Sequence, residues 1–534
     1  MHSECLPFSS IPHSTELFTD FLSYSGKTRD FYPRSPYIAE WAADEAKKLE
    51  YPADRRAAVA TILDRQNRAF GSSPKTFENL EKFRRGASVA VTGQQVGLFG
   101  GPLFAVLKAL TAVALAKKAE DAGVRCVPVF WLATEDHDLA EVNHTWIPGS
   151  DGTLVELRSS SAGVEDAPVG NVRFGDEIAA VVEQAAELLG ASEFTDILKQ
   201  AYRPGETMGS AFGKLFASIF REWGVILIDA YDPEFHRLAE PVYRGAIEHT
   251  DDIVQALLER GKELEAAGYH QQVKVTNSST ALFEIRNGKR TVIHRLNDHF
   301  KVGEERCSRE ELLSRIAQAP ENFSANVLLR PIVQDYLLPT LTYTGGPAEV
   351  AYFAQVAVVY ERLLHRVTPV LPRFSATIVA PHQAKLLEKY GLKLSDLFHG
   401  EEKLRVLMSQ NVLPSSMQSD FAEAGDALTR AMEKIRSDLQ KLDPTLVDAA
   451  STAESKMKYQ LDQLASRAAR SQLTRNEVIE RHARVLSANL FPNKELQERE
   501  IAGVYFLAKH GFDLLHQLYE AACNDCPDHQ VVYL

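Results

Sequence analysis

The feature that most constrains the fold is residues 87–138, in which a glycine-rich loop joins a buried strand to a buried helix. An apolar run at 87–91 precedes the loop, Pro102 ends it, and a helical pattern covers 103–120. A second apolar run follows at 124–132. Unbroken apolar runs are typical of parallel strands that are covered on both faces. The order strand, loop, helix, strand therefore predicts an α/β fold with a parallel sheet.

The loop before this helix is a candidate site for an anion. Glycines let the backbone approach a ligand closely, and proline suits the first helical turn because its missing N–H would be unpaired there. The helix start then offers free N–H groups and the positive end of the helix dipole to phosphate or carboxylate groups. The glycine spacing matches neither a P-loop nor the dinucleotide-binding pattern. The candidate binding residues are Thr92, Gly93, Gln94, Gln95, Gly97, Phe99, Gly100 and Gly101.

A cluster of ionisable residues follows the second strand. Trp131 lies near the strand end, and Glu135, Asp136, His137 and Asp138 come directly after it. Ligands of open α/β sheets bind beyond the carboxyl ends of the strands, so we expect the cluster and the loop to share one edge. One carboxylate there could bind an amine while His137 acts as general base. Alternatively, Asp136 and Asp138 could hold Mg²⁺ together with phosphates, or the cluster could be a solvated loop.

Three later segments are expected to reach the same edge. The apolar run 225–229 ends in an acid, which could face a ligand or cap a helix. The order apolar run, glycine turn, proline and helix of residues 87–120 occurs a second time, with an apolar run at 336–344, a Gly-Gly-Pro turn and a helix at 348–364. A strand at 368–371 precedes an arginine that could bind a phosphate or a carboxylate, or form a surface ion pair. These segments contribute Asp229, Tyr343, Gly345, Gly346, Glu349 and Arg373 as candidate binding residues.

Periodicity and turn signals divide the chain into segments. We predict helices at 38–48 and 53–70, one long helix at 232–267, and a β-hairpin around Asn287-Gly288. The predicted domains are a helical N-terminal arm (1–86), the core (87–145, 224–269 and 326–380), a mostly helical insertion (146–223), a β-rich insertion (270–325), a helical coiled-coil domain (381–490) and a helical tail returning to the core (491–534).

Two helices on either side of Asp443-Pro444 predict an antiparallel coiled-coil hairpin. Apolar residues recur about every 3.5 residues in both of them, which is the coiled-coil period. Such a hairpin could join two copies of the chain or pack on its own core.

Composition excludes several classes of protein. The net charge of −13 argues against non-specific binding of nucleic acid. No apolar run is long enough to cross a bilayer, and the N-terminus shows no secretory pattern. Five cysteines in a chain of 534 residues do not suggest a disulfide framework. Cys523 and Cys526 are interpreted as ordinary thiols, and the chain is expected to be soluble and cytoplasmic.

The chain resembles the cysteine ligases of bacillithiol biosynthesis. The resemblance rests on the motifs at 92–102, 131–138 and 343–349 and on the predicted hairpin. The resemblance covers essentially the whole chain. It implies a Rossmann-like core related to nucleotidyl-transferases and class I synthetases, with two connecting-peptide insertions. It also implies dimerisation through the coiled coil, and a reaction that joins cysteine to glucosaminyl-malate through an amide bond.

Amide formation from a carboxylate requires activation, for which ATP is the usual agent. We therefore expect ATP or ADP to bind, with Mg²⁺ as a possible companion. Backbone N–H groups and Arg373 suit such transfers, which depend on positioning and charge stabilisation. Whether the intermediate is an adenylate or an acyl phosphate is left open. Two other classes also stay open, namely a nucleotidyl-transferase acting on another small molecule and a non-catalytic scaffold of the pathway.

Overall fold

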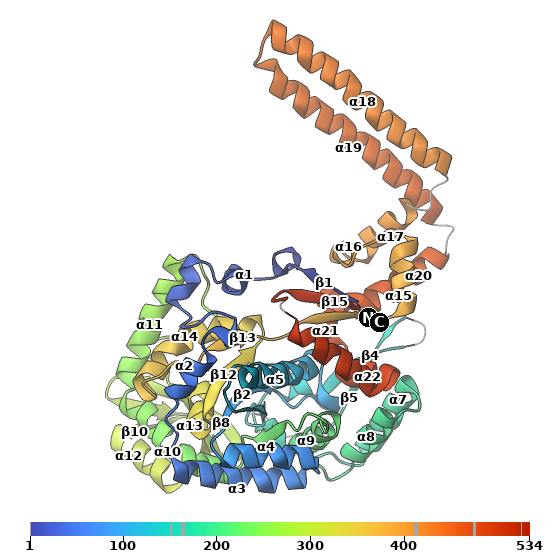
Figure 1. Cartoon of the computed structure of the whole chain (residues 1–534). Helices are drawn as coiled ribbons and strands as arrows, with labels where there is room; N and C mark the ends of the chain where they lie inside the picture. Colours follow the sequence, from blue (N-terminus) through green and yellow to red (C-terminus); the bar gives the residue numbers. More distant parts are fainter. Residues whose placement is uncertain (1, 150–151, 162–165, 411–414, 474–476, 525) are drawn as a thin grey trace.

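Figure 1 shows the computed structural model of the chain, an α/β body from which a long helical hairpin projects. The structure describes residues 2–149, 152–161, 166–410, 415–473, 477–524 and 526–534. The two ends of the chain lie side by side.

A five-stranded sheet forms the centre of the body, in the order β13-β12-β2-β3-β6. Every neighbouring pair in it is parallel, which confirms the predicted parallel sheet. The register pairs Gly93 with Trp131 and Leu132 with Asp229, so the carboxyl ends of these strands are level. The strands are β2 (Ser88–Gln94), β3 (Cys126–Leu132), β6 (Ile226–Asp229), β12 (Thr340–Gly345) and β13 (Val370–Pro372).

The sheet is buried on both faces. Consecutive side chains of a strand point to opposite faces. Phe130 accordingly packs in the same apolar cluster as helix α5 (Leu103–Asp121), whereas Trp131 packs in the cluster that contains helix α14 (Pro347–Leu363). The two helices that follow the glycine turns therefore cover opposite faces of the sheet.

The strands after β2 are added on one side of it, and those after β12 are added on the other side, so the strand order reverses between β2 and β12. Helix α5 leads from β2 to β3 on one side, and helix α14 leads from β12 to β13 on the other side. This arrangement makes the β2/β12 boundary a topological switch point, where open α/β sheets form a ligand crevice beyond the strand ends.

The segment between β3 and β6 is mostly helical and contains a short antiparallel strand pair. Helices α8 and α9 pack together, and α9 also packs on the turn at Leu98–Gly100. The elements of this region are α6 (Leu139–Val142), β4 (His144–Pro148), β5 (Leu154–Arg158), α7 (Glu177–Leu189), α8 (Glu193–Ala201) and α9 (Met208–Ile219).

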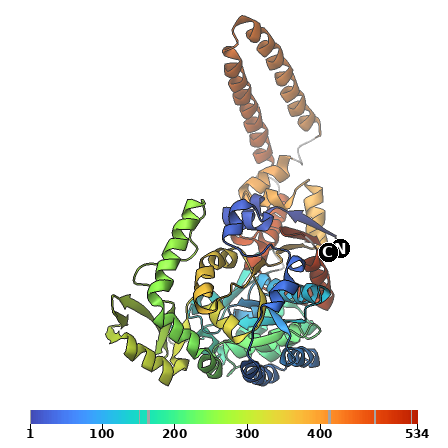
Figure 2. The same ribbon diagram turned by 60° about the vertical axis from the view of Figure 1, so that its left-hand side comes forward.

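The predicted helix 232–267 is wrong as a single element, because it breaks at His249. The break separates α10 (Pro233–Glu248) from α11 (Thr250–Ala266). It lets α10 pack on the β-rich insertion while α11 packs along α14. Figure 2 shows α11 projecting beside the body in green. Hydrophobic periodicity continues across the break, so the sequence pattern did not reveal it.

The β-rich insertion forms an antiparallel sheet in the order β10-β9-β8-β7-β11. Asn287 and Gly288 form the predicted hairpin turn with positive φ angles of 51° and 79°. Residues 270–275, the first part of the predicted β-rich insertion, form a loop and no strand. The elements are β7 (Leu282–Arg286), β8 (Lys289–Leu296), β9 (His299–Val302), β10 (Glu305–Ser308), α12 (Arg309–Gln318), β11 (Phe323–Ala325) and then α13 (Arg330–Leu337).

The N-terminal arm and the C-terminal tail each contain a strand that the sequence pattern did not predict. Strand β1 (His2–Leu6) pairs with β15 (His529–Tyr533), which also pairs with β14 (Ala376–Val379). A disulfide joins Cys5 to Cys526, so the interpretation of Cys526 as an ordinary thiol is wrong. The helices of these two segments are α1 (Glu16–Ser23), α2 (Ala42–Lys47), α3 (Ala53–Ala69), α4 (Pro74–Arg84), α21 (Gln497–Glu500) and α22 (Gly503–Cys523).

The projecting hairpin consists of α18 (Ser415–Leu442) and α19 (Leu446–Leu473), as predicted. Met432 and Ala450 are buried in its seam, whereas Leu442, Tyr459 and Leu464 are exposed. The base of the hairpin is formed by α15 (Pro381–Lys389), α16 (Leu394–Leu397), α17 (Glu401–Gln410) and α20 (Glu477–Leu490). Across the described ranges of the chain, no helix combines the length and apolar character needed to cross a membrane.

Candidate active site

A cavity of about 390 Å³ lies at the switch point. The ends of β2, β3 and β12 and the loops after them supply one part of its wall. The β-rich insertion, α5, α13, α14, α21 and the residue after β13 supply the rest. The sequence-predicted residues that line it are Gly93, Gln94, Gln95, Trp131, Glu135, Asp136, Tyr343, Gly346, Glu349 and Arg373.

Lys108 connects the two glycine turns at the cavity wall. Its Nζ atom donates hydrogen bonds to the Gly93 carbonyl and to Gln94 Oε1, each at 2.9 Å, and lies 2.6 Å from Glu349 Oε2. Burial lowers the pKa of Lys108, and Glu349 opposes that shift. Burial alone would raise the pKa of Glu349, but the adjacent Lys108 ammonium holds it below its ordinary value. Lys108 was not predicted from the sequence, although it is the one charged residue in the mostly apolar stretch 103–116.

The second glycine turn is shaped around Glu349. The Gly346 N–H donates to Glu349 Oε2 at 2.8 Å, and the Tyr343 hydroxyl donates to the other carboxylate oxygen. A Cβ atom at Gly345 would lie 2.6 Å from the Glu349 Cβ, so only glycine fits at that position. The Gly346 N–H at the start of α14 is therefore paired with a carboxylate of the same helix.

Residues 97–101 of the first glycine loop pack against the helical insertion instead of facing the cavity, whereas Gly93, Gln94 and Gln95 line it. The Gly100 N–H donates to the Tyr202 hydroxyl at 3.1 Å, and the Phe99 ring contacts the Tyr202 ring edge-on. The Leu103 N–H donates to the Ile501 carbonyl at 2.9 Å. The expectation of a free N–H at this helix start is therefore wrong at Leu103, because the C-terminal tail covers it. The predicted residues Thr92, Gly97, Phe99, Gly100, Gly101 and Gly345 lie outside the cavity lining.

The acidic cluster after β3 divides into two parts. Glu135 and Asp136 line the cavity, whereas His137 and Asp138 do not. Asp136 accepts hydrogen bonds from Gln95 Nε2 at 2.6 Å and from the His137 N–H at 2.8 Å. Asp138 caps helix α6.

Arg290 of the β-rich insertion reaches the acidic cluster. Its Nη1 lies 3.1 Å from His137 Nδ1, and its Nε and Nη2 donate to Ser324 Oγ and the Ala325 carbonyl. A guanidinium only donates hydrogen bonds, so His137 Nδ1 is the acceptor and its ring proton lies on Nε2. The lone pair that a general base would use is thus already engaged by Arg290. The sequence analysis missed Arg290, since it lies on a strand more than 150 residues away.

Asp229 lies behind the cavity wall. It accepts hydrogen bonds from the Thr134 hydroxyl and the Tyr231 N–H. Burial raises the pKa of Asp229, and these bonds oppose the shift. Its contacts hold the loop after β3 against the loop after β6.

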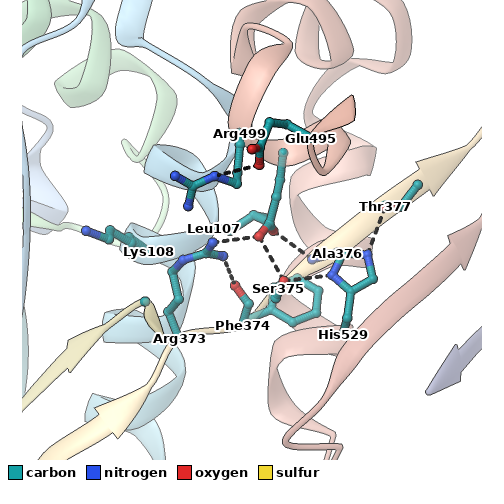
Figure 3. Close-up of polar contacts among 12 residues, drawn as sticks. Leu107, Lys108, Arg373, Phe374, Ser375, Ala376, Thr377, Glu495, Arg499 and His529 are labelled. Carbon is teal, nitrogen blue, oxygen red and sulfur yellow. Dashed lines mark hydrogen bonds and ion pairs between the residues drawn. The ribbon is translucent and has the colours of Figure 1, made fainter. Parts of the chain in front are cut away.

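Arg373 lies in a buried polar network that Figure 3 shows. Its Nη2 donates to Glu498 Oε1 at 2.6 Å, and Ser375 Oγ also donates to Glu498, at 2.8 Å. His529 contacts the Ser375 and Thr377 hydroxyls through its two ring nitrogens, and burial lowers its pKa to about 4. Arg373 thus forms a buried ion pair with Glu498 and not the surface ion pair of the predicted alternative, and it also lines the cavity.

Two further arginines line the cavity without having been predicted. Arg330, from the start of α13, is partly buried and donates to the Tyr352 hydroxyl at 2.8 Å and to Gln334 Oε1 at 3.1 Å. Arg499, from α21, is about half exposed at the rim, with Nε 3.4 Å from Glu495 Oε2. The cavity therefore has a strongly cationic side.

The parallel sheet, the charged cavity at its switch point and the projecting hairpin define a Rossmann-like α/β enzyme with a C-terminal coiled-coil domain. Residues 1–374 match the family described as "Bacillithiol biosynthesis BshC, N-terminal Rossmann-like domain". Residues 376–534 match "Bacillithiol biosynthesis BshC, C-terminal coiled-coil domain". The chain belongs to this family, and it is a ligase.

Curated relatives match over nearly their full length. A protein of Koribacter versatilis named "Putative cysteine ligase BshC" is 50% identical over 532 residues, covering 100% of both chains. Proteins of the same name from Solibacter usitatus and Salinibacter ruber are 37% and 33% identical, covering 100% and 97% of this chain and 100% and 96% of their own. A Campylobacter jejuni structure described as a "putative arginyl t-RNA synthetase" is 12% identical, covers 87% of this chain and 98% of its own, and has a TM-score of 0.24.

Proposed function

We propose that the chain joins L-cysteine to glucosaminyl-malate through an amide bond, the last step of bacillithiol biosynthesis. The observation that carries this proposal is the charge pattern of the cavity. Lys108, Arg290 and Arg373 contribute buried cationic side chains to its lining, Arg330 contributes a partly buried one, and Glu135, Asp136 and Glu349 contribute carboxylates.

This pattern fits the chemistry of the two substrates. Malate carries two carboxylates and cysteine carries one, and arginine recognises such groups through paired N–H donors. Glucosamine carries an amine, for which a buried carboxylate is the natural acceptor. A cavity with both kinds of group can therefore bind the acid and the amine together.

The reaction needs the cysteine carboxylate to be activated, and we propose ATP as the agent. A carboxylate oxygen of cysteine attacks a phosphorus atom of ATP, and pyrophosphate or ADP leaves. The glucosamine amine then attacks the acyl carbon, AMP or phosphate leaves, and the amine gives up a proton. Among the three predicted catalytic residues, Asp136 lines the cavity. His137 could accept the proton only after Arg290 releases its Nδ1.

The residues present do not fit a protein-held Mg²⁺. Asp136 already accepts hydrogen bonds from Gln95 and a backbone N–H, and Asp138 caps α6. We therefore assign no step to a metal held by the protein. The binding of Mg²⁺ together with ATP remains a prediction.

The test is a turnover assay with purified chain, cysteine and glucosaminyl-malate, with and without ATP. The proposal predicts one amide product per ATP consumed and no product without ATP. Pyrophosphate release that does not need cysteine would instead indicate a nucleotidyl-transferase. No turnover by a folded chain, combined with loss of cellular thiol on deleting it, would indicate a scaffold.

We also propose that the hairpin of α18 and α19 joins two copies of the chain. Ile435, Leu442, Tyr459 and Leu464 are large apolar side chains that stay exposed on it. Large apolar side chains that stay exposed on a projecting hairpin are available for contact with a second copy. Sedimentation of the full chain should give a dimer, and Ile435→Asp with Leu464→Asp should give a monomer. A monomeric wild type at micromolar concentration would contradict the proposal.

A further inference from the structure

Two buried polar atoms in the cavity wall lack a partner. Trp131 is 1% exposed and Glu135 is 8% exposed, and both line the cavity. Within the described part of the chain, neither Trp131 Nε1 nor Glu135 Oε1 has a hydrogen-bond partner. Leaving such a group unpaired costs about 1–3 kcal/mol, so a ligand group that pairs with either atom would be favoured.

The two atoms call for opposite kinds of ligand group. The indole N–H of Trp131 only donates, so it needs an acceptor. The Glu135 carboxylate only accepts when it is ionised, so it needs a donor. Burial raises the pKa of Glu135, while His236 and Arg290 oppose this shift. A cationic donor from the ligand would favour the ionised form further.

His236 lies behind Glu135 but does not supply the missing donor when its ring is neutral. Its Nδ1 lies 2.8 Å from the Phe323 carbonyl, which can only accept, so Nδ1 carries the proton. Its Nε2 is then an acceptor, and it faces Glu135 Oε1 at 3.4 Å. When the His236 ring is neutral, His236 Nε2 and Glu135 Oε1 are both acceptors. Glu135 Oε1 can then accept a hydrogen bond from an N–H group in the cavity.

We propose that this wall is the amino-sugar subsite: the sugar amine donates to Glu135 Oε1, and a sugar oxygen accepts from Trp131 Nε1. A neutral N–H donor suits an uncharged hydroxyl or ring oxygen. The carboxylates of malate and cysteine have Arg330 and Arg373 as stronger partners in the same cavity. This inference rests on the proposed function, because it names which part of that reaction's substrates the wall binds.

The test is a binding titration of the full chain with two ligands, glucosaminyl-malate and its glucosyl analogue, in which a hydroxyl replaces the amine. Wild type should bind the amine at least tenfold more tightly than the hydroxyl analogue. Glu135→Gln should reduce that preference to within threefold. Glu304→Gln, a matched change on a 98% exposed side chain, should keep the full preference.

Trp131→Phe tests the other half of the subsite. It should weaken the binding of both sugars by a similar factor of at least fivefold while preserving the preference for the amine. Because the preference is a ratio within one variant, partial loss of folded protein does not change it. If Glu135→Gln does not fold, the Trp131→Phe result decides the proposal.

Each of four outcomes would contradict the proposed subsite. Two concern the preference for the amine: its absence in wild type, or its full retention in Glu135→Gln. The other two concern affinity: unchanged sugar binding in Trp131→Phe, or weaker binding of cysteine alone in Glu135→Gln. Failure of the proposed function looks different. In that case wild type prefers the amine in the titration but forms no amide with cysteine and ATP.

Discussion

The Nζ atom of Lys108 lies 2.6 Å from Oε2 of Glu349, and this ion pair joins the two helices that leave the sheet at its switch point. Lys108 belongs to α5 on one face, and Glu349 belongs to the first turn of α14 on the other. The same lysine holds the Gly93 carbonyl and Gln94, so a single side chain ties both glycine turns to one cavity wall.

Replacing Lys108 by methionine should destabilise the chain strongly. Removing one partner of a buried pair leaves the other charge uncompensated, which costs about 3–5 kcal/mol. Chemical denaturation should therefore show a large loss in the free energy of unfolding for Lys108→Met. Lys108→Met with Glu349→Gln should recover part of it, since no buried charge remains unpaired.

The matched control is Lys117→Met in the same helix. Lys117 forms an exposed ion pair with Asp121 one turn away, and such pairs contribute little. Equal losses for Lys108→Met and Lys117→Met would show that the buried pair does not hold the switch point together.

Asp136 and Asp138 should behave differently although they are two residues apart. Asp136→Asn changes a carboxylate in the cavity lining, so kcat should fall by about 100-fold, as is typical when a group that acts on a proton or a charge is lost. Asp138→Asn should keep kcat within about twofold, because asparagine caps a helix as well as aspartate does. Steady-state kinetics on both variants measures this. Near-normal turnover of Asp136→Asn would remove it from the catalytic residues.

The stability of the chain should fall between pH 6.5 and about 4 because of His529. Burial lowers the pKa of His529 from 6.5 to about 4 in the folded chain. In that window the unfolded chain takes up a proton that the folded chain does not, so the free energy of unfolding falls as the pH falls, by about 3 kcal/mol in total. Above pH 6.5 this contribution is fully present.

His529→Gln should flatten that part of the pH profile, as measured by chemical denaturation at several pH values. His516→Gln is the control, because His516 is half exposed beside Glu222. A profile for His529→Gln that is as steep as that of wild type would contradict the assignment to His529.

The sequence predicted those parts of the fold that depend on local pattern. Unbroken apolar runs gave β2, β3 and β6, the Asn287-Gly288 pair gave a hairpin turn, and the coiled-coil period gave α18 and α19. The rule that ligands bind beyond the carboxyl ends of parallel strands correctly brought Gln94, Trp131, Glu135 and Glu349 to one cavity.

Long-range partners were beyond the reach of local pattern. Strands β1 and β15 are short, and they pair only because the two ends of the chain meet. Arg290 and Arg330 enter the cavity from the β-rich insertion and from α13, and nothing in their local sequence marks them as cavity residues. The first glycine loop was assigned to a ligand, but Tyr202 and Ile501 occupy its donors.

The central claim is that the cavity between β2 and β12 is where the amide bond forms. A crystal structure of the chain soaked with cysteine, ATP and glucosaminyl-malate tests this most directly. We predict the sugar amine within hydrogen-bond distance of Glu135 and the malate carboxylates on Arg330 and Arg373. Substrate density at any other place on the molecule, with this cavity holding only water, would contradict the claim.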